Sequence, residues 1–329
     1  MNKTNQTKEH FHSINILRGL AALAVCLFHF TDGFLQPENW LRVVNHYGYL
    51  GVDAFFVISG FVIPYSFSVK NYHIKQYWSF FKKRFVRIEP AYWASMFLMI
   101  FKDIISSFLT DYRYFKFPPY DPLSIALHFI HANDFFGKKW IIFPYWTLAI
   151  DWQFYLFIGV IFFIIKRPEW WVRYSVYIFF IGIKWWFSED LKPWLFYHAM
   201  SFLPGIVLFH HKKGFIGKIE MYAIWLVILY YVQYKLGWNH CLAIAASCLI
   251  IEFITGDWKI TNFMGKISYS MYLTHIFSGW WFCVVMILTV QQEWMKDFVV
   301  LGGVLVSIAF AKLFYDKIES PTQEWARKV

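Results

Sequence analysis

The sequence has little charge for its length. Of its 329 residues only 16% are Asp, Glu, Lys or Arg, whereas about 25% is usual in soluble domains. Hydrophobic residues make up 58% of the chain and aromatic residues 23%. Apolar runs of roughly 17 to 25 residues, the length that crosses about 30 Å of hydrocarbon, recur from end to end. This composition excludes an ordinary soluble domain and predicts an integral membrane protein.

Cysteine is scarce as well, and no CxxC pair occurs. The four cysteines are Cys26, Cys241, Cys248 and Cys283. Each lies inside an apolar run, where a free cysteine behaves as a small core residue. The histidine pairs at 10 and 12, 128 and 131, and 210 and 211 have metal-like spacing, but no cysteine or carboxylate cluster lies near them in the sequence. The sequence therefore predicts no metal site.

The apolar runs predict an all-α polytopic bundle of about ten transmembrane helices. The spans are centred on residues 13–31, 47–67, 88–109, 145–165, 171–187, 196–210, 219–236, 239–256, 267–288 and 298–316. The short, proline-flanked stretch 120–136 is interpreted as an interfacial or re-entrant segment. No repeat or soluble linker interrupts the pattern, so residues 1–329 are predicted to form one domain, with a helical bundle over 13–316 and tails at 1–12 and 317–329.

Basic residues are unevenly distributed over these spans. With the N-terminus in the cytoplasm, most Lys and Arg residues fall in inner segments, so the positive-inside rule predicts that both termini are cytoplasmic. A net charge of +10 then fits a basic face against anionic membrane lipid, without a nucleic-acid partner. The first span lacks a small-residue cleavage site, and we expect a retained helix, not a signal peptide.

Ionisable residues within the first apolar run, INILRGLAALAVCLFHF, point to function. Arg18 and His29 are eleven residues apart, which is three helical turns plus about 20° and a rise of about 16 Å. They therefore share one helix face, with Arg18 near the inner end and His29 near the outer end. Intramembrane ionisable residues usually face a cavity or a partner. The alternative is that each side chain only reaches for its nearest membrane interface.

Two carboxylates are predicted to lie at the same membrane depth as His29, near the outer side. Asp53 and Asp151 each lie about 9 Å into a helix that starts outside. A carboxylate bonded to one imidazole nitrogen fixes the tautomer and leaves the other nitrogen as a base. Either carboxylate is thus a candidate to orient His29, and helix-to-helix hydrogen bonding is the alternative role.

Two further arginines are predicted to lie at the same membrane depth as Arg18, near the cytoplasmic side. Arg84 and Arg87 lie one turn apart in FFKKRFVRIEP. Three guanidinium groups at one level suit a phosphate-rich ligand, because arginine binds phosphate through two hydrogen bonds. The alternative is an ordinary positive-inside cluster.

These residues resemble membrane-bound acyltransferase family 3, whose signature is an arginine and a histidine separated by ten residues in the first helix. The resemblance continues through GVDAFFVISGF (51–61), RFVRIEPAYW (84–93), WTLAIDWQFYL (146–156), ISYSMYLTHI (267–276) and IESP (318–321). One departure is that Thr147 and Asp151 stand where the family usually has Ser and Glu, so the carboxylate is one methylene shorter.

The resemblance implies an O-acyltransferase that takes an acyl group, most often acetyl, from coenzyme A on the cytoplasmic side. Arg18, Arg84 and Arg87 would hold the phosphates of this co-substrate, and His29 would act as general base on the acceptor hydroxyl. An acyl-histidine intermediate is the alternative route. Candidate residues lining the acyl channel are Ser59, Trp146, Tyr272 and His275.

The expected acceptor is a surface polysaccharide or a lipid-linked oligosaccharide, modified by an enzyme of the bacterial cytoplasmic membrane. The outer segment 111–143, which is rich in aromatic residues, is expected to face it; an interfacial aromatic belt is the alternative. Small-molecule or antibiotic acylation is the second choice. A proton-coupled transporter is a competing class, but the chain lacks the inverted repeats typical of transporters. A membrane binding protein without chemistry would not need these buried charges.

Overall fold

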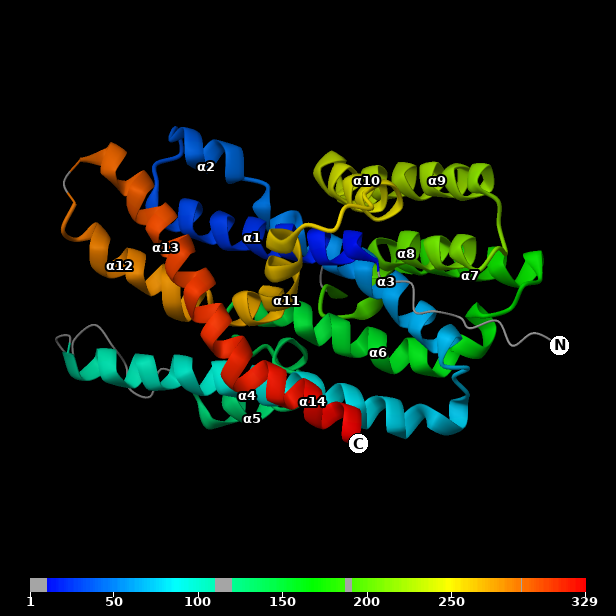
Figure 1. The fold of residues 1–329 in the computed structure, drawn as a ribbon, viewed down its shortest axis with the longest axis horizontal. Coiled ribbons are helices and arrows are strands. Elements are labelled where there is room, and N and C mark those ends of the chain that lie inside the picture. Colours follow the sequence, from blue (N-terminus) through cyan, green and yellow to red (C-terminus); the bar gives the residue numbers. More distant parts are fainter. Residues whose placement is uncertain (1–10, 110–119, 187–190, 291) are drawn as a thin grey trace. The chain divides into compact units, whose positions relative to one another are not determined.

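The computed structural model describes residues 11–109, 120–186, 191–290 and 292–329, and these residues form helices without any β-strand (Figure 1). Helices are expected in an apolar chain, because they pair every backbone N–H and C=O within one segment. The all-α prediction is therefore confirmed for the described residues. The chain forms two compact units, which are Met1–Ala21 with Leu50–Phe80 and Gln153–Gly265, and Ala22–Tyr49 with Phe81–Trp152 and Lys266–Val329.

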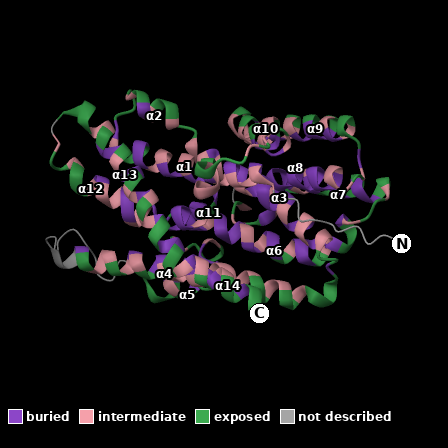
Figure 2. Cartoon of the chain, viewed as in Figure 1, coloured by how far each residue is buried: buried purple, intermediate pink, exposed green. Residues whose placement is uncertain are grey.

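The first unit is built around two closely packed helices, α3 (Gly51–Val69) and α8 (Ala199–Lys212). A Cβ atom at Gly60 would lie 2.1 Å from the carbonyl oxygen of Phe202, and one at Gly205 would lie 2.2 Å from that of Val57. Glycine at both positions therefore lets the two backbones touch. Figure 2 shows α8 as almost continuously buried, as expected of a helix that is apolar all round.

The described part of the first unit also contains parts of α1, α4, α6 and α11 and three further helices. They are α7 (Trp170–Ile183), α9 (Lys218–Leu236) and α10 (Trp238–Phe253). In Figure 1 α9 runs beside α8 and α10 runs beside α9. The α9–α10 connection turns at Gly237, whose φ of 99° few other residues adopt.

The second unit contains long and short helices. They are the later part of α1 (His12–Phe34), α2 (Trp40–Asn45), most of α4 (Tyr77–Leu109), α5 (Pro122–His128), the start of α6 (Tyr145–Ile165), most of α11 (Lys259–Thr274), α12 (Trp281–Ile287), α13 (Glu293–Phe314) and α14 (Ser320–Lys328). A π-helix, Ile276–Trp280, separates α11 from α12, and the chain bends there by 57°. A second π-helical turn, Tyr315–Glu319, joins α13 to α14.

Among the described residues, four stretches are long and apolar enough to cross a membrane, and the bent pair adds a fifth. They are His12–Phe34, Trp40–Val69, Tyr145–Ile165, Glu293–Lys328 and the pair Lys259–Thr274 with Ile276–Ile287. Within the described residues each predicted span overlaps a helix, but the number ten and the cytoplasmic termini remain predictions. Large apolar side chains such as Phe163, Leu226 and Leu305 are more than half exposed, which suits contact with lipid.

Several boundaries differ from the predicted spans. Helix α4 begins at Tyr77, well before the expected residue 88, because the charged stretch KKR is still a good helix former. The span expected at 47–67 is preceded by α2 and a short 3-10 turn, and α3 begins only at Gly51. Within 120–136 the helix α5 has 7 residues, which is too short to cross a membrane, so this stretch is not an eleventh span.

Candidate active site

The site in the second unit is centred on two stacked histidines. His29 on α1 lies against His275, which follows α11, with ring centroids 5.3 Å apart and ring planes inclined by 26°. His29 is half-buried, while His275 is 1% exposed. The structure thus brings together a predicted base and a predicted lining residue.

The tautomer of His275 follows from its contacts. Nδ1 lies 2.9 Å from the carbonyl oxygen of Tyr272 and 3.1 Å from that of Met271, so Nδ1 carries the hydrogen and donates it. Nε2 is then an acceptor, and it is buried without a hydrogen-bond partner among the described residues. The π-helix starts directly after His275, and such helical bulges are frequent at functional sites.

The first turn of α6 is tied to the same cluster. The hydroxyls of Tyr272 and Thr147 lie 2.6 Å apart, and they lie 2.8 and 3.0 Å from the carbonyl oxygen of Pro144. The ring of Tyr272 lies 6.2 Å from that of His275. Thr147 thus supplies a hydroxyl at the position where the family usually has serine, and this hydroxyl contacts Tyr272. Trp146 and Asp151 belong to the same helix, with Asp151 one turn after Thr147.

Asp53 has partners that the sequence did not indicate. It lies on α3 in the first unit and is 5% exposed. One carboxylate oxygen accepts from Ser201 at 3.0 Å and the other is paired with Nδ1 of His240 at 2.7 Å. Asp53 thus orients a histidine, but this histidine is His240 on α10. A role of Asp53 in orienting His29 stays a prediction. No short sequence motif indicates His240 as a partner.

The remaining predicted residues are distributed over both units. Arg84 and Arg87 lie one turn apart on α4 in the second unit, and both are half-buried, as is Arg18. Arg18 belongs to the part of α1 assigned to the first unit, so the convergence of the three arginines on one ligand stays a prediction. Ser59 is buried on α3 beside Gly60, in the closely packed part of the first unit.

The helices of membrane length indicate an integral membrane protein, and comparison with known sequences adds its family. The pattern of one family, described as an acyltransferase domain, matches residues 11–315. The chain therefore belongs to this acyltransferase family, and the resemblance noted in its motifs is confirmed.

Two curated proteins are similar to this chain. ORF330 of Acidianus two-tailed virus, named as a proposed acetyltransferase, is 26% identical over 304 residues, which cover 83% of this chain and 84% of that protein. The peptidoglycan O-acetyltransferase OatA of Listeria monocytogenes is 27% identical over 163 residues, which cover 46% of this chain but only 24% of OatA. No solved structure matches the chain.

Proposed function

We propose that this protein is an O-acetyltransferase of the bacterial cytoplasmic membrane, with cytoplasmic termini. It moves an acetyl group from cytoplasmic acetyl-CoA to a hydroxyl of a surface polysaccharide or a lipid-linked oligosaccharide. The family supports acyl transfer, and the name of the OatA relative supports a glycan acceptor. The stacked pair of His29 and His275 is the observation that carries the proposal, because it places the imidazole rings of two motif residues against each other.

In the proposed reaction His29 removes the proton from the acceptor hydroxyl. The resulting oxygen attacks the thioester carbonyl, the carbon–sulfur bond breaks, and the proton passes from His29 to the sulfur of the leaving CoA. A base in this position typically contributes roughly 10² to 10⁴-fold to the rate. His275 supports the ring of His29 by stacking and offers a second acceptor nitrogen beside it.

The proposed donor site lies at the opposite end of α1. Arg18, Arg84 and Arg87 bind the phosphates of acetyl-CoA through charge-assisted hydrogen bonds. Arg18 and His29 are eleven positions apart on α1, which corresponds to a rise of about 16 Å that the pantetheine arm would cover.

The proposal is tested in the native host. The gene is deleted and complemented with wild type or His29→Ala at equal membrane levels, and alkali-labile acetate is measured on purified surface polysaccharide. Restoration by wild type alone supports both the reaction and the role of His29. If wild type does not change polysaccharide acetate, the glycan acceptor is wrong; a small-molecule acceptor would then be sought by following radiolabelled acetate.

A further inference from the structure

A second polar cluster in the same unit surrounds Glu89 on α4, which is 1% exposed. One carboxylate oxygen, Oε1, accepts from Nε2 of His131 at 2.8 Å and from Nε1 of Trp152 at 2.6 Å. The other oxygen, Oε2, is buried and has no hydrogen-bond partner among the described residues. Because Nε2 of His131 donates to Glu89, Nδ1 is an acceptor, and it too is buried without a described partner.

Tyr92 supplies a third polar atom of this kind. It follows Glu89 by one turn of α4 and its ring lies 4.6 Å from that of His131. Its hydroxyl is buried and unpartnered within the described part of the chain. Buried polar atoms are nearly always paired in native proteins, because an unpaired one loses its hydrogen bonds to water without replacement. Three such atoms on neighbouring side chains indicate a place for a polar ligand.

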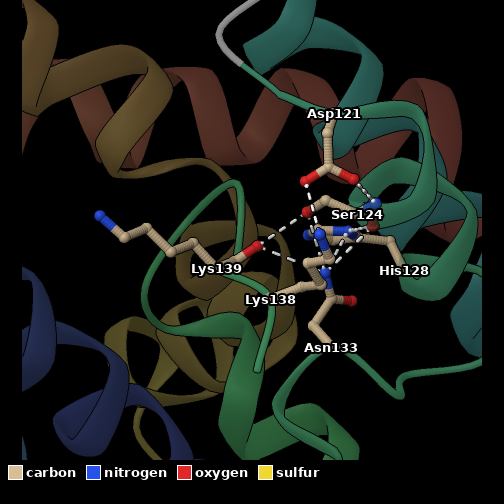
Figure 3. Close-up of polar contacts among 6 residues, drawn as sticks. All are labelled: Asp121, Ser124, His128, Asn133, Lys138 and Lys139. Carbon is tan, nitrogen blue, oxygen red and sulfur yellow. Dashed lines mark hydrogen bonds and ion pairs between the residues drawn. The ribbon is translucent and has the colours of Figure 1, made fainter. Parts of the chain in front are cut away.

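The backbone of His131 provides independent support. Its φ is 54°, a left-handed conformation that non-glycine residues seldom adopt and that often marks functional sites. The surrounding hydrogen bonds shown in Figure 3 hold this turn in place. The amide of Asn133 donates to the carbonyl oxygens of Ser124 and Lys139 at 3.0 and 3.3 Å, and Asp121 accepts from the backbone N–H of Ser124 at 2.8 Å.

We propose that Glu89, His131 and Tyr92 form a subsite that binds hydroxyl groups of the acceptor, an inference that rests on the proposed function. Oε2 of Glu89 and Nδ1 of His131 accept hydrogen bonds from two neighbouring hydroxyls of a sugar ring. The hydroxyl of Tyr92 donates to a ring or glycosidic oxygen.

Charge and position favour the acceptor over acetyl-CoA as the occupant. A buried carboxylate repels phosphate, whereas it attracts hydroxyl donors. His131 belongs to the segment expected to face the acceptor. A series of contacts within the second unit also connects this cluster with His29 and His275. Tyr92 packs against Tyr145 with ring centroids 4.6 Å apart. Tyr145 begins α6, whose Thr147 bonds to Tyr272.

The test uses the purified full-length chain in lipid nanodiscs. The probes are the methyl glycosides of glucose and of N-acetylglucosamine, and CoA release is measured while probe and acetyl-CoA are varied separately. We expect the probes to stimulate CoA release. Glu89→Gln is expected to raise the KM for the sugar about tenfold, which is the usual effect of losing one hydrogen bond to a charged group. The KM for acetyl-CoA is expected to stay unchanged. Tyr92→Phe is expected to raise the sugar KM several-fold without lowering thermal stability.

His128→Asn is the matched control. His128 lies three residues before His131 and is also buried, but both of its ring nitrogens are engaged, by the Ser124 carbonyl at 2.6 Å and the Ile141 N–H at 3.0 Å. Its replacement is expected to lower thermal stability without separating the two KM values.

Two results would overturn the subsite. The first is that Glu89→Gln and Tyr92→Phe change both KM values equally or change only stability, which would make the cluster structural. The second is that wild type releases CoA at a rate that neither sugar affects; the acyltransferase proposal would then survive alone. Absence of any CoA release from wild type would instead reject the proposed function and this inference with it.

Discussion

His29 and His275 come from opposite ends of the chain, yet their rings stack with centroids 5.3 Å apart. The hydrogen on Nδ1 of His275 points to backbone carbonyl groups. Its Nε2 is therefore available as an acceptor beside the proposed base. This arrangement predicts that the two histidines contribute to the reaction in different ways.

Replacement of His29 by Ala is expected to lower kcat by roughly 10² to 10⁴-fold, because the base is lost. His275→Phe keeps a stacking ring but removes the nitrogen, and we expect a smaller loss of about tenfold. CoA release by the purified enzyme measures both. His46→Ala, at an exposed position after α2, is the control and is expected to behave as wild type. Full activity of His29→Ala would refute the assignment.

The arginines are expected to act on the donor. Arg84→Ala and Arg87→Ala should each raise the KM for acetyl-CoA by about tenfold or more, the weight of a charge-assisted hydrogen bond. Lys83→Ala removes a neighbouring exposed cation and is expected to have little effect. Acetyl-pantetheine, which lacks the nucleotide phosphates, tests whether the arginines bind these phosphates or another part of the donor. If the variants also raise the KM for this short donor, the arginines do not bind phosphate.

The contact between α3 and α8 is expected to tolerate no side chain at Gly60. In Gly60→Ala the new Cβ would lie 2.1 Å from a backbone oxygen, so the helices must separate, at a cost of about 1–3 kcal/mol. Gly182→Ala adds the same atom on α7, where nothing lies within 4 Å. Thermal unfolding in detergent should show a large decrease for the first variant only. Equal midpoints would mean that the two helices are not in close contact.

Asp53 and His240 are expected to be energetically coupled. Their 2.7 Å contact predicts a coupling energy of about 0.5–3 kcal/mol in a double-mutant cycle of Asp53→Asn and His240→Ala. Unfolding midpoints of the four proteins supply the measurement. Additive effects on stability, with loss of activity in Asp53→Asn alone, would instead favour the predicted role of Asp53 toward His29.

His128 predicts a pH dependence of the segment that carries His131. Burial lowers the pKa of His128 from 6.5 to about 4, so the folded state binds this proton less readily than the unfolded state. The corresponding stabilisation is complete above pH 6.5 and is lost as the pH falls toward 4, by an amount on the order of 3 kcal/mol. Limited proteolysis within 120–143 should therefore accelerate over this range.

The control for this pH effect is His128→Asn, which has no titrating ring at this position. It is expected to be cleaved faster than wild type at pH 7 but to respond less to acid. An unchanged pH response in this variant would assign the effect to other groups.

Much of the fold could be predicted from the sequence, because apolar runs and helical periodicity are local properties. The first helix and α6 lie where the runs placed them, and Arg84 and Arg87 lie one turn apart. The break after His275 was not predicted, since a π-helix leaves no interruption in an apolar run.

The sequence by itself determined the membrane class, the helical structure, the acyltransferase motifs and the spacing of Arg18 and His29 along one helix. Only the tertiary structure decided which side chains meet. It stacked His275 on His29, paired Asp53 with His240, and brought His131 to Glu89. Periodicity determines the face and depth of a residue within its own helix, whereas its partner depends on which helices pack together and in which rotation. That information is distributed over the whole chain.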